Sequence, residues 1–471
     1  MLPDVALLEI FDFYVDEDDT EEWHILVHVC RKWRDVVFGS PCRLNLRLYC
    51  RARTPVRKTL YIWPALPIVI SANSYGMWGA DNIIAALEHS HRICHLDLAN
   101  FTSSQFEKVL AATQQPFPAL THLELRLRDE TAPIIPDSFL GGSAPQLRRL
   151  LLDRIPFPGL PKLLLSATHL VNLDLQRIPH SGYFSPEELV TCFSVLTNLK
   201  RLNIEFESSQ SWPDQKSRRP PPSTRALLPA LTELQFIGVS EYLEDLVARI
   251  DAPLLDKSDI VFFHQLIFDC PQLAQFISRT PKLKASDEVH VIFHDGSVWV
   301  TLPQTFDGSL QLGISCTGSD WQLSSLAQVC SSSLPQDLIS MVEQLYIQCG
   351  NWVMPCTDDI ENNQWLELLH PFTAVKRLYI SWKFTSSIGP ALQELSGERV
   401  IEVLPALESL FLESELSGER VIEVLPASLF LPVESEPPED SRLVEEGIRQ
   451  FVSARHLAGH PITVSRWDGS M

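Results

Sequence analysis

The densest group of side chains that could do chemistry lies at residues 89–95, where the sequence reads HSHRICH. His89, His91, Cys94 and His95 are residue types that ligate zinc, and a cysteine beside a histidine can also act as a nucleophile. The same segment runs directly into a leucine-rich strand pattern, which favours structural side chains at the border of a strand. We therefore predict neither a metal site nor a catalytic thiol here.

Two further histidines, His24 and His28, are four residues apart, a spacing that places both imidazoles on one face of a helix. No glutamate follows His24 as in the HExxH zinc motif, and no third ligand is evident. The chain also lacks the GxxxxGK[ST], GxGxxG and GxSxG motifs. The sequence thus predicts a protein that is not an enzyme and that needs no metal and no cofactor.

Composition and charge narrow the classes of partner. The chain has 471 residues, of which 45% are hydrophobic and 21% charged, as in ordinary well-cored proteins. Its net charge of −21 disfavours general nucleic-acid binding, because a polyanion is repelled at long range. Residues 43–58 contain six basic and no acidic side chains, which we interpret as a solvated, partly paired face.

Cysteine usage and hydropathy bear on the compartment. The ten cysteines include no CxxC pair and no dense framework, which indicates free thiols in a reducing environment. The apolar start MLPDVALLEIFDFYV has acidic residues and no basic segment, so we do not interpret it as a signal peptide. No run of about 18 apolar residues is present. We expect a cytoplasmic and/or nuclear protein without a membrane partner.

The N-terminal region must position its apolar residues on short helices. Leu7, Leu8, Ile10 and Phe11 cluster on one stretch, and a second helical pattern spans about residues 22–37. Helices this short and apolar are not stable alone, so they must pack against each other and against a partner. The acidic segment between them, residues 16–22, is interpreted as a solvated loop.

The stretches LPDVALLEIF and LVHVCRKWRDVVFGSP resemble the F-box, over about residues 2–45. The usual glutamate after LPx and the usual tryptophan after SP are both missing. The resemblance implies a helical domain over residues 1–50 that docks on a Skp-type adaptor and, through it, on a cullin scaffold. It implies adaptor-binding roles, at or under the interface, for Leu2, Pro3, Leu7, Ile10, Phe11, Leu26, Val29 and Trp33.

A repeated LxxLxL pattern follows a connector of residues 51–92. Successive matches begin 23 to 33 residues apart, except for the 111 residues between Leu231 and Val342. We predict about three degenerate units in that gap, with strands near VHVIF at 289 and LQLGI at 310. The nine matches begin at Ile93, Leu120, Leu147, Leu170, Leu199, Leu231, Val342, Val375 and Leu407.

Helical stretches lie between these strands, and the clearest begins at Ser185 with a serine cap, a proline and Glu188 closing a capping box. Strand, turn and helix units of this kind cannot bury their apolar faces alone, so they stack into a solenoid. Residues 93–413 resemble the leucine-rich repeat family, with Ile155 and Ile178 standing where asparagine or cysteine is usual. The implied fold class is α/β: a short helical F-box followed by an irregular leucine-rich repeat solenoid, with parallel strands on the concave face and helices outside.

Three other segments do not belong to the repeat pattern. Residues 207–230 are rich in proline and serine and are interpreted as an exposed loop. The sequence ELSGERVIEVLPA occurs at residues 394–406 and again at 415–427, so that SLFL at 409 and at 428 compete for one strand position. Our hypothesis is that one copy completes the sheet and the other is extruded or adds a short edge strand. An acidic linker and a last helix make residues 414–471 a C-terminal cap.

An F-box followed by irregular leucine-rich repeats is similar to the expanded F-box families of fungi. The resemblance implies a substrate-recognition subunit of an SCF-type cullin-RING ubiquitin ligase, whose repeats bind a target protein that the sequence does not identify. Two alternatives stay open: a repeat scaffold that acts without the ligase, and an enzyme that uses the HSHRICH cluster.

Overall fold

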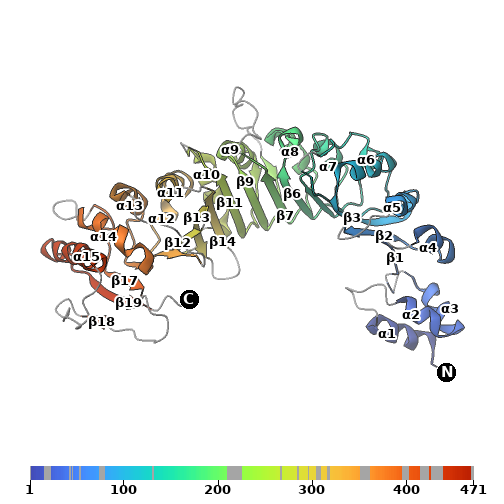
Figure 1. The fold of residues 1–471 in the computed structure, drawn as a ribbon, viewed down its shortest axis with the longest axis horizontal. Coiled ribbons are helices and arrows are strands. Elements are labelled where there is room, and N and C mark those ends of the chain that lie inside the picture. Colours follow the sequence, from blue (N-terminus) through green and yellow to red (C-terminus); the bar gives the residue numbers. More distant parts are fainter. Residues whose placement is uncertain are drawn as a thin grey trace. The chain divides into compact units, whose positions relative to one another are not determined.

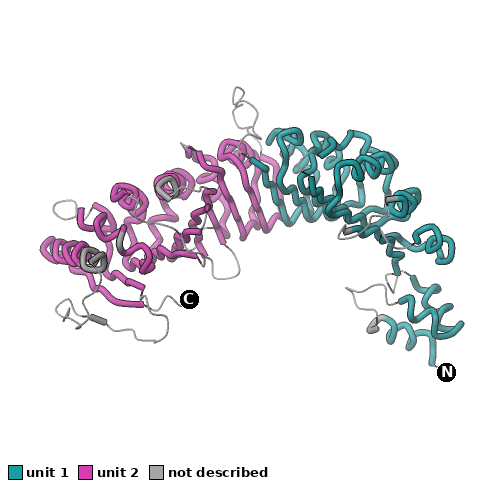
Figure 2. The backbone as a smooth tube through the Cα atoms, viewed as in Figure 1, with its two compact units in different colours: residues 1–213 teal, residues 214–471 magenta. Residues whose placement is uncertain are grey.

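The computed structural model forms two compact units, residues 1–213 and residues 214–471 (Figure 2). It describes residues 2–14, 23–41, 44, 46–51, 55–73, 80–129, 132–208, 225–265, 268–283, 286–294, 296–303, 309–315, 319–350, 361–394, 402–413, 424–425 and 439–467. The acidic segment 16–22, most of the proline-rich loop and most of both ELSGERVIEVLPA copies lie outside these residues.

Unit 1 begins with a module of three helices, α1 (Asp4–Tyr14), α2 (Trp23–Val29) and α3 (Arg31–Gly39). The prediction of one continuous second helix is wrong. Cys30 has extended backbone angles (φ −160°, ψ 169°) and separates α2 from α3, and its Sγ accepts a hydrogen bond from Trp33 N at 3.5 Å. Phe11 and Trp33 pack edge to face with centroids 4.8 Å apart, which joins α1 to α3.

The remainder of unit 1 is a parallel sheet of seven strands, each paired with the next in sequence (Figure 1). Its core is filled by the leucines of the repeat pattern, such as Leu96, Leu123 and Leu150, all fully buried. The strands are β1 (Leu48–Cys50), β2 (Ile68–Asn73), β3 (Ile93–Phe101), β4 (His122–Leu127), β5 (Arg149–Asp153), β6 (Asn172–Ile178) and β7 (Arg201–Phe206).

The parallel order starts earlier than the first LxxLxL match at Ile93. Both β1 and β2 belong to it, so much of the segment assigned to a connector is sheet and helix. Strand β2 aligns Ile70 with Leu96 and Ala72 with Leu98. Because Pro67 stands at the first position of the pattern and alanine replaces its last leucine, this repeat does not match the motif.

Helices cover one face of the unit 1 sheet (Figure 1). The α8 helix begins with the predicted capping box, in which Ser185 Oγ accepts from Glu188 N at 3.2 Å and Glu188 Oε2 accepts from Ser185 N at 2.9 Å. The helices are α4 (Val56–Ile62), α5 (Ala80–Leu87), α6 (Ser103–Ala112), α7 (Leu160–Leu164) and α8 (Pro186–Phe193), with short 3-10 turns at Ser90–Arg92, Phe139–Gly142 and His180–Gly182.

A recurring backbone turn accounts for the missing asparagine or cysteine of the repeat pattern. Asn100, Arg154 and Arg177 have left-handed φ angles of 60°, 59° and 48°, each seven residues after the first position of its repeat. The residue that follows turns back into the core in each case. The buried residues at this position are Phe101, Ile155 and Ile178.

Unit 2 contains a mixed sheet whose spatial order is β9, β11, β14, β13, β12, β15, β16, β17, β19, β18. Strands β8 (Ala226–Leu227) and β10 (Ile250–Asp251) pair separately. The other strands are β9 (Glu233–Gly238), β11 (Lys257–Phe263), β12 (Glu288–His294), β13 (Ser297–Pro303), β14 (Ser309–Ser315), β15 (Gln344–Cys349), β16 (Arg377–Ile380), β17 (Ser409–Glu413), β18 (Val424–Leu425) and β19 (Thr463–Trp467).

The long gap, predicted to hold about three degenerate units, contains β11, β12 and β14, each parallel to an outer neighbour, but these strands are not successive strand, turn and helix units. The predicted strands near 289 and 310 exist as β12 and β14, but β13 lies between them and is antiparallel to both. Gly296, with a φ of 74°, immediately precedes β13. Chain order is therefore inverted here, since β14 pairs with β11 and β12 pairs with β15.

Helices again cover one face of the unit 2 sheet (Figure 1). They are α9 (Ser240–Val247), α10 (Pro271–Arg279), α11 (Ser319–Ser333), α12 (Gln336–Ile339), α13 (Asn362–Leu369), α14 (Thr385–Glu394) and α15 (Glu439–Leu457), with 3-10 turns at Pro281–Leu283 and Trp382–Phe384. Both units thus have the α/β leucine-rich repeat architecture predicted from the sequence. No helix among the described residues is both long and apolar enough to span a membrane.

The two SLFL segments have different positions with respect to the described sheet. The first forms β17, which is parallel to β16 on one side and to β19 on the other. The second, residues 428–431, lies outside the described residues, but Val424 and Leu425 of the second repeated copy form β18, antiparallel to β19. One copy therefore precedes the continuing parallel strand and the other adds a short edge strand.

Candidate protein-binding surfaces

The HSHRICH side chains do not converge on one point. Cys94 Sγ donates to the carbonyl oxygen of Ile68 at 3.4 Å, and burial raises the pKa of its thiol. His95 stacks instead on His122 of the next strand, with centroids 5.1 Å apart. The described part of the chain contains no group of three or more side chains that could hold a metal ion. The seven cysteines within the described residues are all free thiols.

His24 and His28 take part in an aromatic contact between the helical module and Trp63, the residue that follows α4. The His24 ring stacks on Trp63 with centroids 4.9 Å apart and planes 7° apart, and His28 meets the same indole edge-on at 5.9 Å. Trp23 packs on Trp63 at 5.3 Å and donates from Nε1 to the carbonyl oxygen of Arg47 at 3.1 Å. Burial, and to a lesser extent His28, lowers the pKa of His24.

The structure divides the eight residues predicted to bind an adaptor into three groups. Leu7, Phe11 and Leu26 are buried inside the module, and Trp33 is half-buried against Phe11. The exposed members are Leu2, Pro3, Ile10 and Val29.

Two exposed apolar side chains of the module were missed at the sequence level, Val5 and Ile25. Ile25 and Val29 are 57% and 55% exposed and lie four residues apart on α2, so they share one face of that helix. The i, i+4 spacing of Ile25 and Val29 was the signal available in the sequence. Together with Leu2, Val5 and Ile10 they form what we call the module's apolar surface residues.

Exposed large apolar residues are concentrated at this end of the chain. Of the fourteen such residues in the described ranges, five fall within the first 29 positions. Single exposed apolar side chains are normal, whereas a concentration of them indicates contact with another molecule. Lys32 fixes the start of the module, since its Nζ contacts Asp4 Oδ1 at 3.1 Å and donates to the carbonyl oxygen of Leu2 at 2.8 Å.

The predicted basic strip is only partly described. Within it, Arg57 forms an exposed ion pair with Glu88 at 3.3 Å, in keeping with a solvated and partly paired face.

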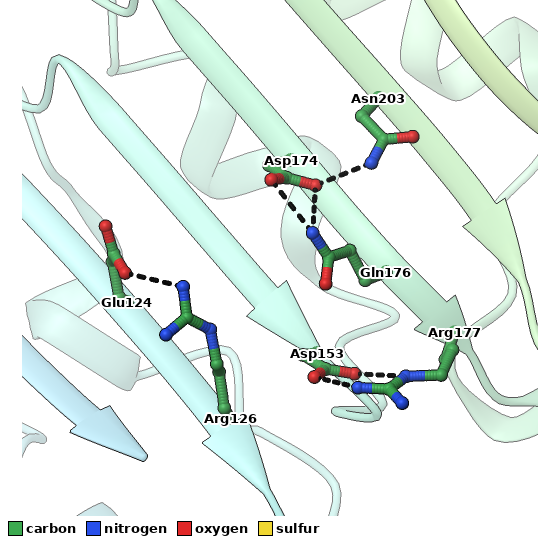
Figure 3. Close-up of polar contacts among 7 residues, drawn as sticks. All are labelled: Glu124, Arg126, Asp153, Asp174, Gln176, Arg177 and Asn203. Carbon is green, nitrogen blue, oxygen red and sulfur yellow. Dashed lines mark hydrogen bonds and ion pairs between the residues drawn. The ribbon is translucent and has the colours of Figure 1, made fainter. Parts of the chain in front are cut away.

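In unit 1, the sheet face opposite the helices carries a network of charged and amide side chains (Figure 3). Glu124 accepts a hydrogen bond from Arg126 at 3.0 Å and forms an ion pair with Arg149, on the adjacent strand, at 2.9 Å. Asp174 accepts from Gln176 at 3.1 Å and from Asn203, on the next strand, at 2.8 Å. These contacts link side chains of the face to one another within a strand and between neighbouring strands.

Asp153 and Arg177 form the most buried ion pair of this face (Figure 3). Arg177 Nε donates to Asp153 Oδ1 at 2.7 Å, and a second arginine nitrogen contacts Oδ2, which makes the pair bidentate. The hydrogen bond to Asp153 raises the pKa of Arg177. The pair joins two strands where Arg177 takes its left-handed conformation, so its first role is structural.

Four strands of unit 2 carry aromatic rings at the aligned position of their sheet, whereas β9, β11 and β14 carry Gln235, Asp259 and Gln311. His290, Tyr346, Tyr379 and Phe411 occupy the same register position on β12, β15, β16 and β17. Their rings stack with successive centroid distances of 4.5, 4.2 and 4.4 Å and interplanar angles of 13°, 13° and 9°. We call these four rings the aromatic row.

The aromatic row was not foreseen, although the sequence contained its signal. The position between the last two leucines of LxxLxL carries acidic or amide side chains in most of the first six matches, and aromatic ones in the last three. In the first set these are Asp97, Glu124, Leu151, Asp174, Asn203 and Gln235; in the second, Tyr346, Tyr379 and Phe411. The first six matches, which extend to Gln235 at the start of unit 2, therefore present a chemically different surface from the last three.

Comparison with known proteins adds little to this picture. No protein-family model matches the chain, and no curated protein matches it. Among solved structures, the leucine-rich repeat-containing protein LegL7 from Legionella pneumophila matches at 13% identity over 86% of this chain and 97% of that one, with a TM-score of 0.26. Because that score is low, the description of the fold rests on the strand registers and buried leucines given above.

Proposed function

We propose that this protein is the substrate-recognition subunit of an SCF-type cullin-RING ubiquitin ligase. The helical module docks on a Skp-type adaptor, which links the chain to a cullin scaffold, and the repeats hold the target protein. The observation that carries the proposal is the set of apolar surface residues on a module whose own interior is already filled by Phe11, Leu26 and their neighbours. Such residues gain most by burial against a partner.

The buried and exposed residues of the module have separate tasks in this proposal. Leu7, Phe11 and Leu26 hold the three helices together, while Ile25, Val29 and the other apolar surface residues contact the adaptor. Trp33 belongs mainly to the first group because it packs on Phe11. The protein itself performs no bond-making step. It raises the effective concentration of target lysines near the conjugating enzyme.

The test is formation of the adaptor complex by the full chain with Ile25→Asp and Val29→Asp. Two charges placed in an apolar interface should each cost several kcal/mol, so we expect at least about a hundredfold loss of affinity. Replacing Trp33 would be less informative, because loss of its contact with Phe11 would disturb the module itself.

A matched control comes from the repeats of the same unit. Ile134 and Leu165 are 54% and 46% exposed, so Ile134→Asp with Leu165→Asp adds the same charge to similarly exposed sites. This control should bind the adaptor normally. Equal copurification of both double variants would refute the assigned surface. A native chain that folds but does not bind the adaptor would support the second reading, a repeat scaffold that acts without the ligase.

A further inference from the structure

The aromatic row of unit 2 presents the edges of its rings, not their faces. Tyr346 lies between His290 at 4.5 Å and Tyr379 at 4.2 Å, so both faces of its ring are occupied. Tyr379 is likewise enclosed by Tyr346 and by Phe411 at 4.4 Å. The hydrogen-bearing edge of an aromatic ring is its electropositive part and complements the electron-rich face of another ring.

Trp467 already makes this contact within the chain. It lies on β19, the last described strand, and meets Tyr346 and Tyr379 at centroid distances of 6.3 and 5.6 Å and at angles of 65° and 77°. Since the ring faces of the row are occupied, the indole must lie across its edges. Trp467 is 9% exposed and Tyr346 only 3%, so the indole shields this part of the row from solvent.

The covered arrangement leaves one polar group unsatisfied. The Nε1 of Trp467 is buried and has no hydrogen-bond partner among the described residues, which is unfavourable for an indole N–H. Movement of Trp467 into water would satisfy this donor and would uncover Tyr346 and Tyr379. His290 and Phe411, at the two ends of the row, remain half-buried while Trp467 is in place.

Carboxylates stand on both sides of the aromatic row. Glu288 precedes His290 by two residues on β12, and Glu413 follows Phe411 by two residues on β17. Glu288 Oε1 accepts from Gln344 at 3.2 Å, and Glu413 Oε2 accepts from Trp382 N at 3.2 Å. Arg377 lies on β16 at the register position of Glu288, so the row also has a cation beside it. Glu288 and Glu413 outnumber Arg377, and this excess of negative charge disfavours an acidic or phosphorylated ligand and favours an uncharged or basic one.

We propose that the edges of the aromatic row are the binding site for an aromatic side chain of the target protein, which lies on an extended, uncharged or basic segment. Trp467 occupies this binding site in the free chain and leaves it when the target binds. The proposal rests on the proposed function, in which the repeats hold the target, and it names the class of segment that they recognise.

The test uses the full chain and three labelled probes, the capped peptide Ser-Gly-Trp-Gly-Ser and its analogues with leucine or serine at the centre. Fluorescence anisotropy measures their affinities for the native chain and for Trp467→Leu, which keeps an apolar cover but removes the flat ring. We expect the tryptophan peptide to bind the variant about five- to tenfold more tightly than the native chain, the range expected for one edge-to-face contact. Adding Tyr379→Ala should abolish that gain.

Trp382→Leu is the matched control, since it removes an exposed tryptophan of the same unit whose ring is not in the row. It should leave all three affinities unchanged. If Trp467→Leu lowers the melting temperature without any gain in affinity, Trp467 is a packing residue and the proposal is wrong. Equal binding of the leucine and tryptophan peptides would also overturn it.

Two further results keep the outcome clear. If Trp467→Leu does not fold, Trp467→Tyr, which retains a ring of smaller area, should give a smaller gain in affinity for the tryptophan peptide, and no gain would refute the proposal. Adaptor binding, measured on the same preparations, depends on the helical module alone. Its failure would count against the proposed function, whereas the peptide affinities report on the aromatic row.

Discussion

Replacing Glu244 by glutamine should loosen the junction between α9 and α10. Glu244 lies on α9 and is buried, and its two carboxylate oxygens accept from the backbone N–H groups of Gln272 at 2.9 Å and Leu273 at 2.7 Å. These amides belong to the first turn of α10, whose N-cap residue, Cys270, makes no side-chain cap. Glu244 therefore caps the helix of the neighbouring repeat.

The expected cost follows from these two hydrogen bonds. A hydrogen bond to a charged group contributes about 1.5–3 kcal/mol, and a carboxylate at a helix N-terminus adds about 0.3–1 kcal/mol. Glutamine keeps one acceptor but turns an amide N–H group towards a backbone donor, so we expect Glu244→Gln to lose about 2 kcal/mol. Such a loss corresponds to about thirtyfold more frequent local opening.

Amide hydrogen exchange is the suitable assay, because a chain of two units need not unfold in one step. The amides of Gln272 and Leu273 should exchange about thirtyfold faster in Glu244→Gln. An exposed glutamate on α13 supplies the control, Glu367→Gln, which should leave both rates unchanged. Exchange of these two amides within about twofold of the native rate would refute the assignment of Glu244 as the cap.

Three further predictions concern the packing of the repeats. Burial lowers the pKa of His95 to about 4, below its ordinary value of 6.5, and the nearby His122, Arg47 and Arg149 add to this effect. The native state thus resists protonation of His95, so its stability should fall as the pH drops from 6.5 towards 4. After allowance for solvent screening, the expected loss is on the order of 1–2 kcal/mol. Melting temperatures of the native chain and of His95→Asn should therefore diverge with pH, and parallel profiles would contradict this. Gly447→Ala would place a Cβ atom 2.9 Å from the backbone oxygen of Gly389 in the α14–α15 contact, at a cost of about 1–3 kcal/mol. The control is Gly39→Ala, whose Cβ atom would meet nothing within 4 Å. We expect a lower melting temperature only for Gly447→Ala, and equal effects of the two substitutions would contradict this reasoning. Arg455 is fully buried and donates to the carbonyl oxygens of Leu404 at 3.1 Å and Leu407 at 3.0 Å. Arg455→Met should therefore destabilise the last repeat by about 2–4 kcal/mol, measured as faster proteolysis within α15. An unchanged rate of proteolysis would count against this role of Arg455.

The sequence was most informative where burial alone decides the structure. Each LxxLxL match is a strand or leads into one, because its last two leucines are two residues apart and point to one face of the sheet. The repeat that contains β2 does not match the motif, since Pro67 and Ala72 occupy the places of its first and last leucines. The break at Cys30 was missed because the apolar periodicity continues across it and does not report a single extended residue.

The direction of β13 could not be obtained from periodicity. Alternating strands such as VHVIF and VWVTL fit parallel and antiparallel neighbours equally well, and only the turn between them distinguishes the two. The dipeptide Asp295-Gly296 between alternating runs is a hairpin signal that was not used. Its consequence is large, because it inverts the spatial order of β12 and β14.

The functional surfaces were predicted less completely than the strands. Five of the eight residues assigned to the adaptor interface are exposed or half-buried, and the other three fill the interior of the module, because a helical pattern does not distinguish a core face from a docking face. The aromatic row depends on the register between four strands. The motif position of Tyr346, Tyr379 and Phe411 indicates three members of the row, but His290 lies on a strand without a motif match, so its place follows only from the register of the assembled sheet.

The central claim is that the helical module, and not the repeats, joins this chain to a ubiquitin ligase. Hydrogen exchange of the full chain, alone and with a purified Skp-type adaptor, tests it most directly. We predict that the adaptor slows exchange in α1 and α2 and leaves the strands β15, β16 and β17 unchanged, and that Ile25→Asp with Val29→Asp removes this protection. Absence of a complex at micromolar concentrations, or protection in the repeats with none in α1 and α2, would contradict the claim.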